Sequence, residues 1–156
     1  MFPVPTRFFV TSGKAISKVS DLNAFDQALI LAGIGEQNLV SVSSVLPVGV
    51  KKIPKIDLPR GAVTHCVLAQ MRGGEGETIS AGVAYGFRAD GQGGYVAEGH
   101  MYGTQKNLNQ ILEWKMDEMS KLRRMKFKRI YYVTEELDIP LDHYGACLAA
   151  VVFSFD

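Results

Sequence analysis

Two glycine-rich turns in the middle of the chain constrain its fold more than any other feature. They are RGGEGE at 72–77 and DGQGG at 90–94, and they separate runs of strand-forming residues at 62–70, 78–87 and 93–102. Runs of this kind bounded by glycine and polar residues are typical of β-strands. The first turn lacks the GK[ST] ending of a phosphate-binding loop, so a hairpin turn is the favoured interpretation.

Two other stretches have the apolar spacing of helices. The apolar spacing within residues 20–35 predicts a helix that Ser20 or Asp21 can cap and that Gly33 and Gly35 end. A longer helix is expected over residues 107–125, with Thr104 as its cap. Both patterns place an apolar face on one side of each helix, which is what packing on a sheet requires.

The remaining strands are expected on both sides of these helices, at 7–12, 37–47, 129–137 and 146–155. The proline-containing residues 50–61 predict an irregular loop. No internal repeat or linker divides the sequence, so residues 1–156 are expected to form one domain. Several strands with two separate helices favour an α+β domain whose helices cover sheet faces.

Composition argues against several kinds of partner. The net charge is +1, and the only basic cluster, at 121–128, is expected to mark a helix end, so nucleic acid is not an expected partner. No apolar run approaches the roughly 18 residues of a membrane span, and no secretion signal is recognised. Cys66 and Cys147 lie in apolar runs without a CxxC pattern and are expected to be free and buried. We therefore expect a cytoplasmic protein.

The polar residues are uninformative when each is taken alone. His65, His100 and His143 lie far apart and form no ligand pair, so no metal site is expected. Glu98 and His100 are two residues apart on a strand and so share a face, which most often means a surface pair. Asp26 is expected on the exposed face of its helix.

The combination of segments is more specific. Four of them stand in a characteristic order: NAFDQALILAGIGEQNLVSVSSVLP at 23–47, GETISAG at 76–82, YVAEGH at 95–100 and HYGACLAAV at 143–151. In this order and spacing the chain resembles the pyruvoyl-dependent arginine decarboxylases. The resemblance implies a fold that is an αββα layered sandwich, assembled into trimers with sites at subunit interfaces.

The resemblance also implies self-cleavage between Ser43 and Ser44. It would give a small chain, 1–43, and a large chain, 44–156. The hydroxyl of Ser44 would attack the carbonyl of Ser43, and the resulting ester would eliminate to leave a covalent pyruvoyl group derived from Ser44. Asn38 matches the residue that supports this step, with its amide as a plausible donor to the developing oxyanion.

The same resemblance assigns the substrate and its contacts. Glu98 matches the proton donor to the carbon that has lost CO₂, which requires an apolar setting that keeps the carboxyl protonated. Asp26 matches the carboxylate that receives the guanidinium of arginine. The implied reaction converts L-arginine to agmatine and CO₂ through an imine with the pyruvoyl group. Glu77 falls in a family motif with a structural or processing role.

Two alternatives remain open at this point. The same class of enzyme could act on another amino acid, such as histidine or ornithine. An uncut, non-catalytic trimeric binding protein could also keep the same fold.

Overall fold

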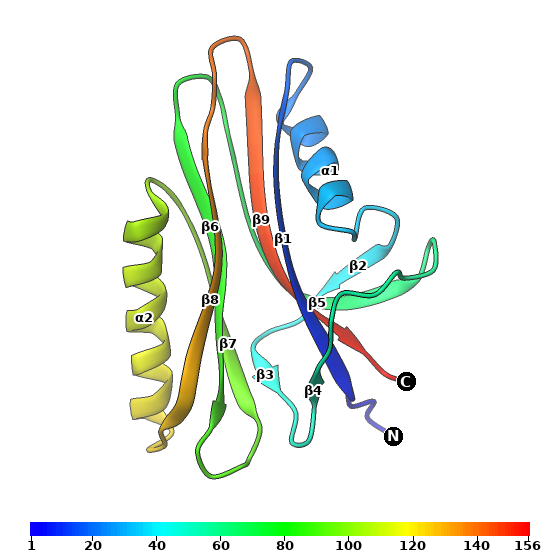
Figure 1. Ribbon diagram of the computed structural model, residues 1–156, viewed down its shortest axis with the longest axis vertical. Helices are drawn as coiled ribbons and strands as arrows, with labels where there is room; N and C mark the ends of the chain where they lie inside the picture. Colours follow the sequence, from blue (N-terminus) through cyan, green and yellow to red (C-terminus); the bar gives the residue numbers. More distant parts are fainter.

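The expected strands form two sheets in the computed structural model, which describes residues 1–156. One sheet has five strands in the order β2-β5-β9-β1-β4, and the other has four in the order β3-β7-β6-β8 (Figure 1). The strands are β1 (Arg7–Ser17), β2 (Asn38–Ser41), β3 (Val45–Leu46), β4 (Lys51–Lys52), β5 (Val63–Gly73), β6 (Thr78–Arg88), β7 (Gly94–Tyr102), β8 (Phe127–Asp138) and β9 (Tyr144–Ser154). The five-stranded sheet mixes parallel and antiparallel pairs. Together with two helices, these sheets confirm the expected α+β class in a single compact domain.

The two glycine-rich turns make different connections. Residues 89–93 join β6 to β7 in an antiparallel hairpin, where Gly91 and Gly93 both have a φ of 78°, which glycine adopts without strain. Residues 74–77 join β5 to β6, which lie in different sheets, so the hairpin expected there is wrong. The reason is long-range: β5 pairs through its edges with β2 and β9 and contacts β6 only through its face.

The first helix, α1 (Asp21–Leu31), forms as expected and packs on the five-stranded sheet. The hydroxyl of Ser20 accepts a hydrogen bond of 3.0 Å from the amide of Asn23 and caps the helix. Gly13 of β1 allows a close approach, because a Cβ atom there would lie 2.4 Å from the carbonyl oxygen of Ala28. A side chain at this position would push the helix off the sheet.

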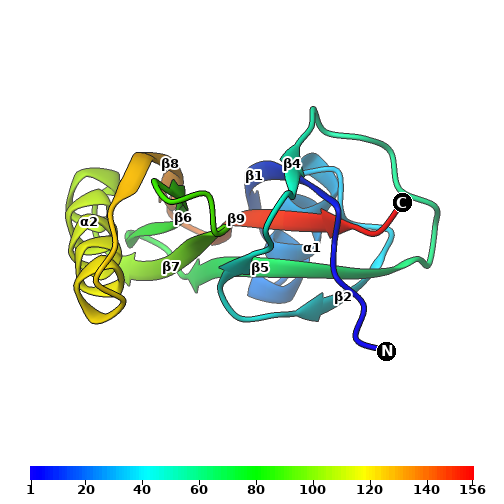
Figure 2. The same cartoon turned by 90° about the horizontal axis from the view of Figure 1, so that it is seen from below.

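The second helix, α2 (Gln105–Leu122), packs on the other sheet, against β6 and β7 (Figure 2). The hydroxyl of Thr104 accepts a hydrogen bond of 3.2 Å from the amide of Asn107, which confirms the expected cap. The buried face of the helix consists of Leu108, Leu112 and Met116. The helix ends within the basic stretch 121–128, as expected.

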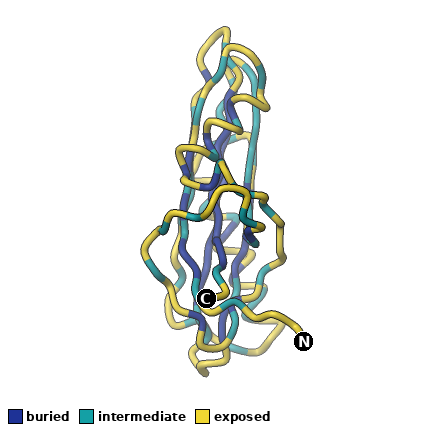
Figure 3. The backbone as a smooth tube through the Cα atoms, turned by 90° about the vertical axis from the view of Figure 1, so that its right-hand side faces the viewer, coloured by how far each residue is buried: buried dark blue, intermediate teal, exposed yellow.

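The largest part of the core lies between the two sheets, where buried residues run along the middle of the molecule (Figure 3). Phe8 and Tyr85 meet there edge to face, with ring centroids 5.8 Å apart. Cys66 and Cys147 are buried and free, as expected. Burial raises the pKa of the Cys66 thiol to about 11 and that of Cys147 to about 12, so both thiols are inert.

The expected strand at 37–47 is wrong in one respect. It is two strands, β2 and β3, which belong to different sheets. The chain therefore crosses from one sheet to the other at residues 42–44, because its hydrogen-bond partners change there from β5 to β7. The strand expected at 7–12 extends to Ser17, and the loop at 50–61 contains the short β4.

The structure contains neither a helix suited to a membrane nor a cluster of metal-binding side chains. Neither helix combines the length and the apolar character that crossing a membrane requires. Nowhere do three His, Cys, Asp or Glu side chains gather as a metal site would need.

Candidate active site

The Ser43–Ser44 peptide bond lies in the short link that crosses between the sheets. Before it, the amide of Val42 donates a hydrogen bond of 2.9 Å to the carbonyl of Cys66 in β5. After it, the carbonyl of Ser44 accepts a hydrogen bond of 2.8 Å from the amide of Val96 in β7. The bond itself consists of the carbonyl of Ser43 and the amide of Ser44, and neither group has a backbone partner. The bond is thus held on both sides by different sheets and is itself unpaired.

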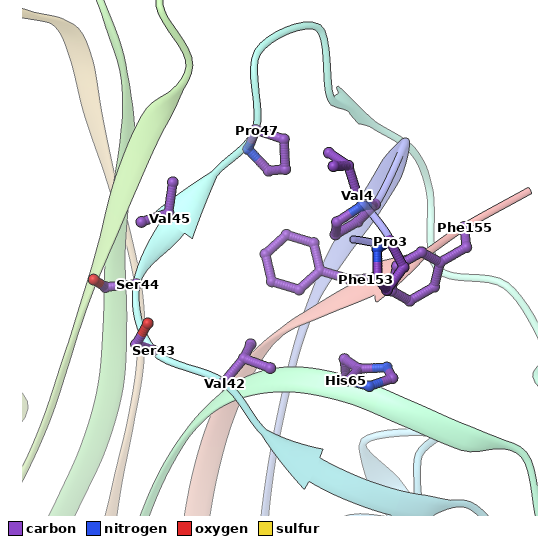
Figure 4. A pocket seen from close by; sticks show the side chains of 11 residues that line it. Pro3, Val4, Val42, Ser43, Ser44, Val45, Pro47, His65, Phe153 and Phe155 are labelled. Atoms are coloured by element: carbon purple, nitrogen blue, oxygen red, sulfur yellow. The ribbon is translucent and has the colours of Figure 1, made fainter. Parts of the chain in front are cut away.

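A hollow of about 420 Å³ opens beside this link (Figure 4). The end of β9 and the N-terminal residues form its other sides. Most of its lining is apolar and consists of Pro3, Val4, Pro5, Val42, Val45, Pro47, Phe153 and Phe155. Its polar residues are Ser43, Ser44 and His65. A mainly apolar hollow with a few polar groups is the usual character of a small-molecule site.

His65 is the residue at this hollow that sequence reasoning missed. Its ring packs edge to face against Phe155, with centroids 5.3 Å apart, and its Nδ1 atom is shielded from solvent without a hydrogen-bond partner. In the sequence His65 is an isolated histidine. It approaches the serines only because β5 pairs in parallel with β2, and no local pattern signals such a long-range pairing.

Glu98 and His100 lie on β7, near the link. The β3–β7 pairing places Ser44 opposite Val96, and Glu98 is two residues further, about 7 Å along a strand and on the same face as Val96. The side chains of Glu98 and His100 are both exposed in the single chain. The apolar surroundings expected for Glu98 are therefore not supplied by this chain alone.

Asn38 and Asp26 lie away from the link. Asn38 begins β2, and its Nδ2 atom donates a hydrogen bond of 2.9 Å to the carbonyl of Gly61. It stands five residues before Ser43, about 16 Å in extended chain. Asp26 lies on the exposed side of α1. The structure brings the serine pair and Glu98 to one region and leaves Asn38 and Asp26 outside it.

Glu77 stabilises another crossing between the sheets, the connection from β5 to β6. Its Oε1 atom accepts a hydrogen bond of 2.6 Å from the amide of Gly74. Its carbonyl accepts another, of 2.9 Å, from the amide of Ile139. These contacts fix the connection between β5 and β6 and give Glu77 a structural role.

Comparison with known families gives the context for this site. A sequence model described as pyruvoyl-dependent arginine decarboxylase (PvlArgDC) matches residues 7–156. The chain belongs to the pyruvoyl-dependent arginine decarboxylase family. Because the matched residues include every helix and strand, the resemblance seen in the sequence is confirmed over the whole fold.

Several proteins named pyruvoyl-dependent arginine decarboxylase are similar to the chain over most of their length. The protein from Pyrococcus abyssi is 36% identical over 135 residues, which are 84% of each chain. The protein from Thermococcus kodakarensis is 31% identical over 150 residues, 95% of this chain and 94% of its own. The protein from Methanopyrus kandleri is 31% identical over 150 residues, 96% of this chain and 97% of its own. The similarity thus extends over both sheets.

Members of this family are named for their dependence on a pyruvoyl group. The residues at the link fit a pyruvoyl group formed from Ser44. Ser44 leads directly into β3, and its carbonyl is already fixed on β7 by the amide of Val96. A new N-terminus at residue 44 would therefore keep its place. The adjoining hollow has room for a small molecule.

Proposed function

We propose that this chain cleaves itself between Ser43 and Ser44 and that the mature enzyme decarboxylates L-arginine to agmatine and CO₂. The cleavage gives a small chain, 1–43, and a large chain, 44–156, which begins with the pyruvoyl group. One observation carries the proposal. In a chain of this family, the Ser43–Ser44 bond is the unpaired peptide that spans the two sheets, and it lies beside a hollow.

The link suits the cleavage step. The carbonyl of Ser43 accepts no backbone hydrogen bond and is open to attack by the neighbouring hydroxyl of Ser44. The hydrogen bonds made by Val42 and by the carbonyl of Ser44 hold the two flanks while the bond between them breaks. Holding reacting groups in a fixed geometry greatly accelerates intramolecular reactions.

Glu98 is the residue that we assign to the proton transfer of the decarboxylation. The pyruvoyl group supplies the electron sink for the charge left when CO₂ departs. Glu98 then delivers a proton to the carbon that has lost CO₂. The ammonium of Lys115 donates to the backbone carbonyl of Glu98 at 2.7 Å and forms no salt bridge with the Glu98 carboxylate. Covering by a neighbouring subunit would favour the neutral carboxyl that this role needs.

Exposed valines around the link support an interface at this edge of the sheets. Val40, Val42, Val45 and Val63 have exposed fractions of 40%, 37%, 56% and 66%. Apolar side chains gathered on a surface are typical of a protein interface. We assign this edge to a trimer of processed protomers in which a neighbouring chain covers the link.

A trimer would also complete the site. Asn38 and Asp26 are exposed and lie away from the serine pair of their own chain, so we assign them to a neighbour's site. Asn38 has a second Nδ2 hydrogen available for the developing oxyanion, and Asp26 can bind a guanidinium through two hydrogen bonds. Within each protomer, α1 on one sheet and α2 on the other support an αββα layered sandwich.

Intact-mass measurement of the purified protein tests the cleavage. We expect two chains, 1–43 and 44–156, with the mass of a pyruvoyl group at the start of the larger one. Borohydride with arginine should label the larger chain, and agmatine should form from arginine, while histidine and ornithine give no amine. A lasting single chain that forms no agmatine would point instead to a non-catalytic binding protein.

Asp26→Asn tests the substrate assignment. It should raise the KM for arginine by about 10- to 100-fold, because a hydrogen-bonded charge is lost, and it should leave cleavage unchanged. Asp57→Asn, at an exposed aspartate in the 50–61 loop, is the matched control. An unchanged KM for arginine in Asp26→Asn would contradict the assignment.

A further inference from the structure

The hollow beside the link contains one group that the proposed reactions leave unused. His65 is the only titratable side chain among the eleven residues that line it. Its Nδ1 atom is shielded from solvent and has no partner. Shielded nitrogen atoms without a partner are uncommon, because folding removes their hydrogen bonds to water. A partner that arrives later would explain the arrangement.

We propose that His65, in its protonated form, binds and positions the carboxylate that cleavage creates at Ser43. The proposal rests on the self-cleavage put forward above. Protonated His65 stabilises this carboxylate as it leaves and then holds the new C-terminus on β5, away from residue 44.

The atoms of the cleavage show where the negative charge appears. Oγ of Ser44 attacks the carbonyl carbon of Ser43, the peptide C–N bond breaks, and an ester and a free amine result. The α-proton of residue 44 then passes to solvent and the Cβ–Oγ bond breaks. Both oxygens stay with Ser43 as a carboxylate, and residue 44 becomes a dehydroalanine, which takes up water and releases ammonia to give the pyruvoyl group.

The hollow itself offers the new carboxylate no other counter-ion, and His100 on β7 lies outside its lining. The other lining residues are apolar apart from the two serines, and a carboxylate in such surroundings needs a partner. β2 carries no charged residue, and the N-terminal amine belongs to the fully exposed Met1. Arg7 at the start of β1 and Asp156 after β9 pair with each other at 2.8 Å. His65 is the group that remains.

The geometry allows the contact once the bond is cut. His65 lies opposite Val40 in the β2–β5 register, so the Cα atoms of His65 and Ser43 are about 11 Å apart by parallel-strand spacings. Figure 4 shows both residues lining the hollow, with Val42 between them. Val42 stays bonded to the carbonyl of Cys66, so Ser43 alone becomes free to turn toward the imidazole.

Titration of the histidine rings by NMR tests this inference in the mature protein. Compared with uncleaved Ser44→Ala, the cleaved protein should show a titration midpoint for His65 that is higher by about one pH unit, because an adjacent carboxylate favours the charged ring. His143, half-buried like His65 but outside the hollow, should show the same midpoint in both. Equal midpoints for His65 in the two proteins would overturn the inference. A single chain by intact mass would instead be a failure of the proposed function.

Cleavage kinetics supply a second test. At pH 6, His65→Gln should cleave about tenfold more slowly than wild type and accumulate an ester that hydroxylamine cuts, because the leaving carboxylate loses its cation. His65→Lys should restore the rate, and His143→Gln is the matched control. The ratio of the wild-type rate to the His65→Gln rate should fall toward one as pH rises and the imidazole loses its proton. Equal rates at every pH, or no recovery in a folded His65→Lys, would overturn the proposal.

Discussion

Two of the connections between the sheets, β5 to β6 and β2 to β3, have the same topological role and opposite construction. Residues 74–77, the closed connection, join β5 to β6, and hydrogen bonds tie Glu77 to its own turn and to the buried Ile139. Residues 42–44, the open connection, join β2 to β3 and have one hydrogen bond on each flank of the Ser43–Ser44 bond (Figure 1). The fold therefore concentrates rigidity at one crossing and leaves a peptide bond available for chemistry at the other.

Removal of the Ser44 hydroxyl has the largest expected effect, because it should make the open connection unreactive. Ser44→Ala should abolish cleavage and agmatine formation, because no ester can form, while the free energy of unfolding changes by no more than about 0.5 kcal/mol. Intact mass, an agmatine assay and urea unfolding measure these quantities. Ser41→Ala, three residues earlier, should cleave normally. Two chains or agmatine from Ser44→Ala would disprove the role of the open connection.

A pair of glutamate substitutions separates catalysis from stability. Glu98→Gln should lower kcat by about 10²- to 10⁴-fold and leave cleavage intact, because it removes a proton donor. Glu77→Ala should leave kcat unchanged and lower the free energy of unfolding by about 1–3 kcal/mol, because the Gly74 amide loses its acceptor. Steady-state kinetics and urea unfolding of both variants test the contrast. Similar losses of activity in the two variants would contradict it.

Packing should differ between the connections as well. Ile139→Ala should destabilise the fold by about 2–5 kcal/mol, because Ile139 is only 3% exposed. Val42→Ala should cost about 0.5 kcal/mol, because Val42 is 37% exposed in the single chain. Urea unfolding in the uncleaved Ser44→Ala background allows a direct comparison. If Val42→Ala lowered the free energy of unfolding more than Ile139→Ala, the open connection would be the more rigid of the two.

Acid gives the smallest expected effect, near the open connection. The hydroxyl of Ser154, and then Arg7, lower the pKa of Asp156 from 3.8 to about 2. Because the folded value lies below the unfolded one, this stabilisation is present above about pH 4 and is lost as pH falls toward 2. Asp156→Asn should therefore show a smaller fall in melting temperature over this range than wild type. Parallel falls would show that the ion pair makes no contribution.

The locally coded parts of the fold could be predicted from the sequence. The caps at Ser20 and Thr104 form as expected because a hydroxyl beside free helix amides needs no distant partner. The family resemblance likewise points to the serine pair within a strand-like segment, and cleavage at this pair stays a prediction. These features depend on neighbours in the chain, which the sequence displays directly.

The crossing at the serine pair could not be predicted in the same way. Val40 and Val42 alternate as in one continuous strand, and the change of sheet depends on partners at Cys66 and Val96, far along the chain. The place of His65 depends on the same long-range pairing. Asp26 and Asn38 could be named from the resemblance, but both are exposed in the single chain, and their place in a site with the serines stays a prediction.

The position of β1 in the sheet has a consequence for mass action. β1 belongs to the segment before Ser44, yet it pairs along eleven residues with β9 and also with β4, both of which follow the cut. Before the cut these hydrogen bonds lie within one molecule, and after the cut the same hydrogen bonds join two separate chains. Unfolding then becomes a dissociation, and the melting temperature of the mature protein should rise with its concentration. Dilution would then separate the two chains of one protomer, a loss that the uncut chain cannot undergo.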